Sequence, residues 1–177
     1  MQKFHYKEYF WDVTKKIMTV FNDKDEPVYQ LKLARGQQRF KLSLLFNYLW
    51  QEYEIEDGEN RFYLSRNKGV FGWLLPTWQV YQNEQLMGRF RASSLLPLRF
   101  YYDTMEGDRF KFKFRFFTYN AEVRDESGRD VMSVAASIFK LKPEYRIEIH
   151  DGMTHPALLI LLFQVGQEFI SIARKSH

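Results

Sequence analysis

The stretch KPEYRIEIHDGMTHPALLILLFQVGQEF, residues 142–169, sets the fold prediction for this chain. In its first part Tyr145, Ile147 and Ile149 alternate with charged residues, which is the period-2 pattern of a half-buried β-strand. Its second part is an unbroken apolar run over residues 157–163, typical of a helix that is buried on all sides. The stretch therefore predicts a strand, a polar turn and then a core helix.

We predict that this helix spans residues 154–175. Thr154 can cap its start, Pro156 suits its first turn, and Arg174 and Lys175 place positive charge at its C-terminal end. A membrane span needs roughly 20 apolar residues, and a polar stripe interrupts the second half of this segment. The stripe consists of Gln164, Gln167, Glu168 and Ser171. We expect it to lie where the helix leaves the core, since a buried carboxylate there would need an arginine or lysine partner.

Most of the remaining chain reads as short alternating strands that end in polar turns. Four units vary one pattern: YEIEDGE (53–59), WQVYQNE (78–84), YNAEVRDESG (119–128) and YRIEIHDG (145–152). The Asp57-Gly58 pair suits a hairpin turn that needs a positive φ. Such repeated hairpins favour a barrel or a sandwich over alternating strands and helices. Residues 39–53 fit a helix face or a strand, and continuity with the flanking hairpins favours a strand.

Composition indicates one domain, residues 1–177, with 45% apolar and 18% aromatic residues. The chain contains no cysteine, which excludes disulfides, thiolate catalysis, thiolate metal sites and palmitoyl anchors. The first twenty residues intersperse charges with rings and do not resemble a signal peptide. We therefore expect a soluble protein of the cytoplasm, peripheral at the membrane if it binds lipid.

Three segments together carry a family resemblance: YNAEVRDESGRDVMSVAASIF (119–139), KPEYRIEIHDG (142–152) and ALLILLFQVGQEF (157–169). Hairpins of this kind followed by an apolar C-terminal helix resemble the tubby C-terminal-like superfamily, in particular LURP-one-related and bacterial tubby-like proteins, with phospholipid scramblases as distant relatives. The resemblance extends from about Lys15 onward. It implies a mainly β fold, a closed antiparallel barrel of about a dozen strands around the C-terminal helix. It also implies phosphoinositide binding through lysine and arginine, whereas palmitoyl anchoring of the scramblase kind is not available to this chain.

The stretch DRFKFKFRFF, residues 108–117, carries the main functional signal. Its cations alternate with phenylalanines, so on a strand the cations would share one face and the rings the other. Residues 60–115 contain ten basic and four acidic residues, a surplus of six, whereas residues 1–59 and 116–177 each have one more acidic than basic residue. Arg99 belongs to the same basic region. The candidate anion-binding residues are Arg89, Arg91, Arg109, Lys111, Lys113 and Arg115.

These residues predict a non-enzymatic binding domain that docks on anionic phospholipid head groups. The competing interpretation is an ordinary solvated face whose cations pair with carboxylates on neighbouring strands. A protein-partner scaffold and a lipocalin-like carrier of a small apolar ligand are the alternative functions, and the oligomeric state stays open. We expect no catalytic residues, no cofactor and no nucleic-acid partner. His150, Asp151 and His155 lie close in sequence and could in principle bind a metal ion. They straddle a turn and the start of a helix and do not provide a third ligand together, so we expect no metal site.

Overall fold

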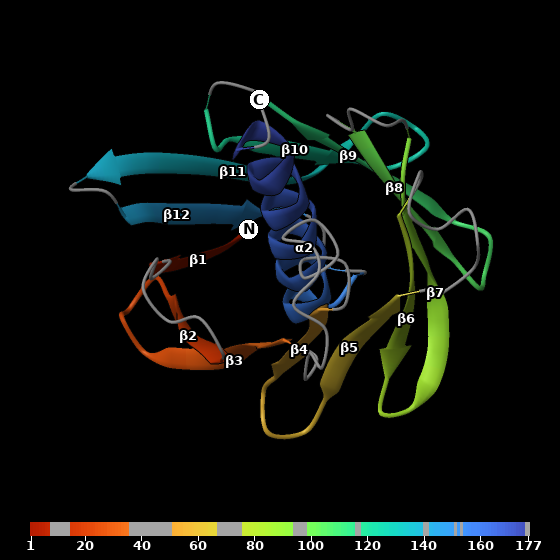
Figure 1. Ribbon diagram of the computed structural model, residues 1–177, viewed down its shortest axis with the longest axis horizontal. Coiled ribbons are helices and arrows are strands. Elements are labelled where there is room, and N and C mark those ends of the chain that lie inside the picture. Colours follow the sequence, from red (N-terminus) through yellow and green to blue (C-terminus); the bar gives the residue numbers. More distant parts are fainter. Residues whose placement is uncertain are drawn as a thin grey trace.

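Twelve antiparallel strands close into a barrel, and one helix runs through its interior (Figure 1). The computed structural model describes residues 1–7, 15–35, 51–66, 76–93, 99–115, 118–139, 142–150, 152 and 154–175. The strands are β1 Gln2–Lys7, β2 Lys15–Asn22, β3 Pro27–Arg35, β4 Gln51–Glu56, β5 Arg61–Arg66, β6 Thr77–Gln82, β7 Gln85–Ala92, β8 Arg99–Thr104, β9 Arg109–Phe114, β10 Ala121–Arg124, β11 Asp130–Phe139 and β12 Lys142–Ile149. The helix is α2, Pro156–Lys175.

The barrel is a simple meander in which each strand pairs with the next one along the chain, and β1 closes it against β12. At the closure Phe4 lies opposite Ile147, and both side chains are buried. A closed sheet leaves no strand edge open for pairing with another chain. The predicted mainly β, closed antiparallel barrel around a C-terminal helix is therefore confirmed.

The hairpin turns follow local sequence as predicted. Gly58 adopts a φ of 93° between β4 and β5, which only glycine reaches without strain. The side chain of Asp57 accepts hydrogen bonds from the backbone N–H groups of Glu59 and Asn60. Residues 51–53 of the predicted strand over 39–53 belong to β4, and residues 39–50 lie outside the described residues.

The start of α2 differs by two residues from the predicted helix over 154–175. Pro156 is the first helical residue, so the cap is His155 and not Thr154. The His155 carbonyl accepts the N–H of Leu158 at 3.1 Å, and its Nδ1 accepts the N–H of Ala157 at 3.3 Å. The imidazole nitrogen accepts the backbone hydrogen bond that a serine or threonine oxygen usually accepts at a helix cap. The fixed φ of proline favours the first helical position, so the cap is the residue directly before Pro156.

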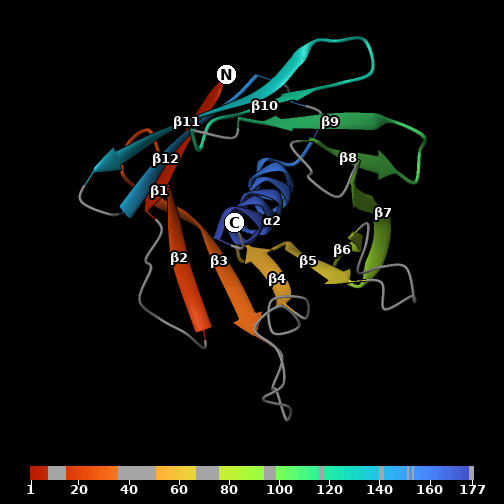
Figure 2. The same cartoon turned by 45° about the horizontal axis from the view of Figure 1, so that its top comes forward.

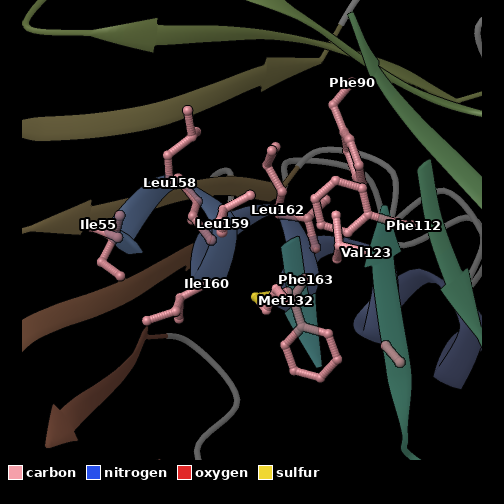
Figure 3. Close-up of a cluster of buried hydrophobic side chains, with 14 of the residues drawn as sticks. Ile55, Phe90, Phe112, Val123, Met132, Leu158, Leu159, Ile160, Leu162 and Phe163 are labelled. Atoms are coloured by element: carbon pink, nitrogen blue, oxygen red, sulfur yellow. The ribbon is translucent and has the colours of Figure 1, made fainter. Parts of the chain in front are cut away.

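Helix α2 supplies the centre of the core. Residues 157–167 are buried without a break, and they pack against the inward side chains of the strands. Figure 3 shows this cluster, with Phe90, Phe112 and Val123 of the barrel wall near Leu162 and Phe163 of the helix. The helix therefore occupies the barrel interior over residues 157–167.

The polar stripe of α2 lies deeper than predicted. Gln164 and Gln167 are 0% and 1% exposed, and Glu168 and Ser171 are half-buried. The Tyr6 hydroxyl donates to Gln164 Oε1 at 2.6 Å, while Glu168 accepts from Gln164 Nε2 and from the Tyr53 hydroxyl, each at 3.3 Å. Burial of Gln164 is possible because the Tyr6 hydroxyl from the wall provides a hydrogen bond that a buried polar group requires, whereas Gln167 Oε1 has no hydrogen-bond partner among the described residues.

Candidate anion-binding face

Strands β7, β8, β9 and β10 lie next to one another in the barrel wall (Figure 2), and their outward side chains are mainly basic. We call its outward side chains the basic face. They are Arg89, Arg91, Arg99, Tyr101, Asp103, Arg109, Lys111, Lys113, Arg115, Glu122 and Arg124. The face combines eight cations with two carboxylates, because the outward positions of β9 and of its neighbours are occupied mainly by arginine and lysine.

Strand β9 follows the predicted alternation. Arg109, Lys111 and Lys113 are exposed, and the phenylalanines between them are buried in the core. Arg115 continues the outward series directly after the strand, while Phe116 lies outside the described residues. The same alternation that anchors the strand in the barrel therefore holds its cations in the solvent.

Strand register brings cations from different parts of the sequence together. Arg99 of β8 lies opposite Lys113 of β9, and Tyr101 lies opposite Lys111. On the other side of β8, Arg91 of β7 also lies opposite Tyr101. Directly opposed side chains in an antiparallel pair have Cβ atoms about 4.5–5.5 Å apart. All six predicted residues thus share one continuous surface.

Part of this charge is neutralised at Asp103. Arg91 Nε lies 3.0 Å from its carboxylate, and Arg109 forms a second, short ion pair with it. Both guanidinium groups also lie near the ring of Tyr101, at 5.2 and 5.7 Å from its centroid. Burial alone would raise the pKa of Asp103, but the hydrogen bonds from the two arginines outweigh it and hold the pKa below its ordinary value.

Glu122 of β10 neutralises the far edge of the face. Its carboxylate lies 2.9 Å from Arg115 and 3.7 Å from Arg124, and the hydrogen bond from Arg115 is the main reason that its pKa is lowered. Arg124 also pairs with Asp130 at 2.9 Å. The interpretation of the face as a set of paired cations therefore holds for four of the eight cations, Arg91, Arg109, Arg115 and Arg124.

The other four cations of the face form no close ion pair, although Lys113 lies opposite Glu122 and helps to lower the pKa of that carboxylate. Arg89, Arg99, Lys111 and Lys113 form no ion pair with any residue that the structure describes. Lys111 and Lys113 are exposed and lie two residues apart on the outer side of β9, with Arg99 beside Lys113. This unpaired group, and not the whole face, is the part of the surface that can bind an external anion.

Sequence reasoning did not assign four members of the face, Tyr101, Asp103, Glu122 and Arg124. Arg124 lies opposite Lys111 across the β9–β10 pair. The ring of Tyr101 lies near the guanidinium groups of Arg91 and Arg109, the two arginines that share Asp103. The signal for Arg124 was present, since Ala121 and Val123 alternate with Glu122 and Arg124. What the alternation could not show is which strand lies beside β9.

The histidines do not form a second site. Within the described ranges no group of three or more histidine, aspartate and glutamate side chains could hold a metal ion. His155 Nε2 lies 3.3 Å from Asp57, and its ring packs 4.8 Å from that of Phe62, so this histidine joins the helix start to the barrel wall. His150 is exposed, and Asp151 lies outside the described residues.

No helix among the residues that the structure describes is long and apolar enough to cross a membrane. Comparison with known proteins gives no match to any family model, curated protein or solved structure. The class that the structure defines is a helix-filled, twelve-strand antiparallel β-barrel with one basic outer face.

Proposed function

We propose that this barrel is a non-enzymatic binding domain that docks on anionic phospholipid head groups through its basic face. Its binding partners are phosphoinositides or other acidic lipids at the cytoplasmic surface of a membrane, to which it attaches as a peripheral protein. The proposal includes membership of the tubby C-terminal-like superfamily, whose members have the same kind of barrel and bind phosphoinositides through lysine and arginine.

The unpaired cations carry this proposal. Arg99, Lys111 and Lys113 lie close together on β8 and β9 and form no ion pair with any described residue, although Lys113 lies opposite Glu122. Next to them, Arg91 and Arg109 share the single carboxylate of Asp103. Each lysine or arginine near an anionic bilayer contributes about 1 kcal/mol of binding free energy. Three such groups acting together give measurable attraction, which salt weakens because the Debye length at physiological ionic strength is only about 8 Å.

The filled interior of the barrel favours docking on a membrane over a function as a carrier of a small ligand. A lipocalin-like carrier needs a vacant lumen, whereas residues 157–167 of α2 occupy the barrel and are buried along their whole length. The cations, in contrast, are displayed on the outer surface of a rigid sheet. A sheet face can contact a flat membrane without any rearrangement of the barrel.

The test is co-sedimentation of the full-length chain with vesicles of phosphatidylcholine alone, or of phosphatidylcholine with phosphatidylglycerol or a phosphoinositide. We expect binding only to the acidic vesicles, and we expect it to weaken as sodium chloride increases. Lys111→Glu/Lys113→Glu should abolish it, since both changes reverse charge within the unpaired group.

The matched control is Lys24→Glu/Arg146→Glu, which changes the net charge equally at two exposed positions outside the basic face. This control should bind acidic vesicles nearly as well as the unaltered chain. Lipid docking would be contradicted if the chain bound neutral and acidic vesicles equally, or bound neither kind of vesicle. It would also be contradicted if both double variants lost binding to acidic vesicles to the same extent. Failure with every vesicle would leave a protein partner as the better explanation of the basic face.

A further inference from the structure

A second surface feature lies at the end of the barrel where α2 begins. There a cavity of about 550 Å³ opens between the turns of the β6–β7, β8–β9 and β10–β11 hairpins and the first turn of the helix. Pockets that hold small molecules have volumes of roughly 300–1,000 Å³. The cavity shares only Arg109 with the basic face, so it is a separate candidate for binding.

One part of the lining of this cavity is apolar. Met87, Phe110 and Leu158 form part of its lining, and Leu86 and Met105 stand at the hairpin turns with 38% and 66% of their surface exposed. Methionine adapts its shape to a bound group because its side chain is unbranched and polarisable. Exposed apolar side chains around a cavity thus provide contact area for an aliphatic chain.

The rim of the cavity carries unneutralised negative charge. The carboxylates of Glu106, Asp108 and Glu126 line it, are exposed and form no ion pair with any described residue. The two arginines of the lining are already engaged, Arg109 with Asp103 and Arg129 with Asp125 at 2.7 Å. The net charge available to a ligand is therefore negative.

The start of α2 does not turn this cavity into an anion site. Pro156 has no N–H, and the N–H groups of Ala157, Leu158 and Leu159 all donate to His155. No backbone donor of this first turn is thus left for an external anion. The carboxylates of the rim are also too dispersed for a metal ion, because no group of three potential ligands occurs in the described part of the chain.

We infer that the cavity binds an alkylammonium group. Its lining combines apolar side chains with exposed carboxylates, and the backbone N–H groups of the first helical turn already donate to His155. The aliphatic chain lies on the apolar side chains of the lining, which include Met87, Met105 and Leu158. The ammonium lies among the carboxylates of Glu106, Asp108 and Glu126. A free amine and the lysine side chain of a partner peptide share this chemistry.

The experiment uses methionine methyl NMR of the full-length chain, which contains six methionines. Hexylammonium at neutral pH should shift the methyl signals of Met87 and Met105 in a saturable way. Met18 and Met132 are buried outside the cavity lining and should not respond. Hexanol and hexanoate have the same chain length without the positive charge, and we expect both to bind at least about threefold more weakly.

A charge-neutral variant tests the rim. Glu106→Gln/Glu126→Gln should weaken hexylammonium binding about threefold to tenfold, since each exposed carboxylate contributes modestly. Glu59→Gln, at a turn outside the cavity lining, and Lys111→Glu/Lys113→Glu, on the basic face, should leave the affinity unchanged. The second control separates this inference from lipid docking, because either property can fail while the other survives.

The peptide N-acetyl-Leu-Lys-Leu-Lys-Leu-amide distinguishes the two sources of the ammonium group. Tighter binding of this peptide than of hexylammonium, with competition between them, assigns the site to a protein partner, and the reverse order assigns it to a free amine. The inference is overturned if hexanol or hexanoate shifts the two methyl signals as strongly as hexylammonium. It is equally overturned if the Glu106→Gln/Glu126→Gln variant binds with unchanged affinity.

Discussion

Gly88 marks the closest approach between two strands of the basic face. A Cβ atom placed there would lie 2.3 Å from the backbone oxygen of Asp103 and 2.9 Å from the ring of Tyr102. The backbone of β8 cannot yield as a flexible side chain could. Because Asp103 also holds two arginines of the basic face, this contact links the packing of β7 on β8 to the arrangement of charge outside.

We predict that Gly88→Ala lowers the free energy of unfolding by about 1–3 kcal/mol, the usual cost of inserting atoms into a well-packed site. Urea denaturation of the full-length chain measures the change. Gly152→Ala is the control, since no atom lies within 4 Å of the added methyl group, and it should stay within about 0.5 kcal/mol of the original. Equal midpoints for the two variants would show that β7 and β8 can separate without cost.

At the scale of elements, α2 determines whether the barrel has a core at all. Leu158, Leu161, Leu162 and Val165 are buried against the wall, and Phe169 is half-buried near its C-terminal end. Burying a side chain of this size contributes roughly 1.5–3 kcal/mol. Several of them together match the typical net stability of a domain, about 5–15 kcal/mol. The helix is therefore an integral part of the fold.

Truncation before Pro156 should yield an insoluble or molten protein, and Leu161→Asp should be nearly as damaging because it buries a carboxylate without a partner. Near-ultraviolet circular dichroism during a thermal melt in detergent-free buffer measures the loss of fixed packing. Leu161→Met preserves volume and should cost less than about 1.5 kcal/mol. A sharp cooperative transition in the truncated chain would contradict a helix-filled core.

At the scale of the whole molecule, carboxylates on strands and in hairpin turns are stabilised in their charged form. Hydrogen bonds from Ser127 and Arg129 lower the pKa of Asp125 from 3.8 to about 2, and the pKa values of Asp57, Asp103 and Glu122 are also lowered. A carboxylate whose pKa is lower in the folded state stabilises the fold above its unfolded pKa. That contribution disappears as the pH falls through the folded pKa.

Stability should therefore fall on acidification from about pH 4 to about pH 2, the interval between the ordinary and the lowered pKa of Asp125. Urea midpoints measured at pH 5, 4, 3 and 2 test this. Asp103→Asn/Glu122→Gln should be less stable at pH 5 and should lose less on acidification, since two of the titrating groups are gone. A variant with the original acid sensitivity would assign the acid transition to other groups.

The amino-acid sequence by itself determined the features that depend on neighbouring residues. Alternation predicted the strands around Tyr53, Trp78 and Tyr145, and an unbroken apolar run predicted α2. The outward direction of Arg109, Lys111 and Lys113 also followed from alternation. These features are local because side-chain direction in a strand repeats every two residues, whatever the strand packs against.

Only the tertiary structure decided which distant residues meet. Tyr6 and Gln164 are 158 residues apart, and their hydrogen bond satisfies a polar side chain that α2 buries inside the barrel. The sharing of Asp103 by Arg91 and Arg109, and the placement of Arg124 beside β9, likewise follow from strand order and register. Such contacts form only when the chain closes on itself, because their energies arise between strands and are absent from any local sequence pattern.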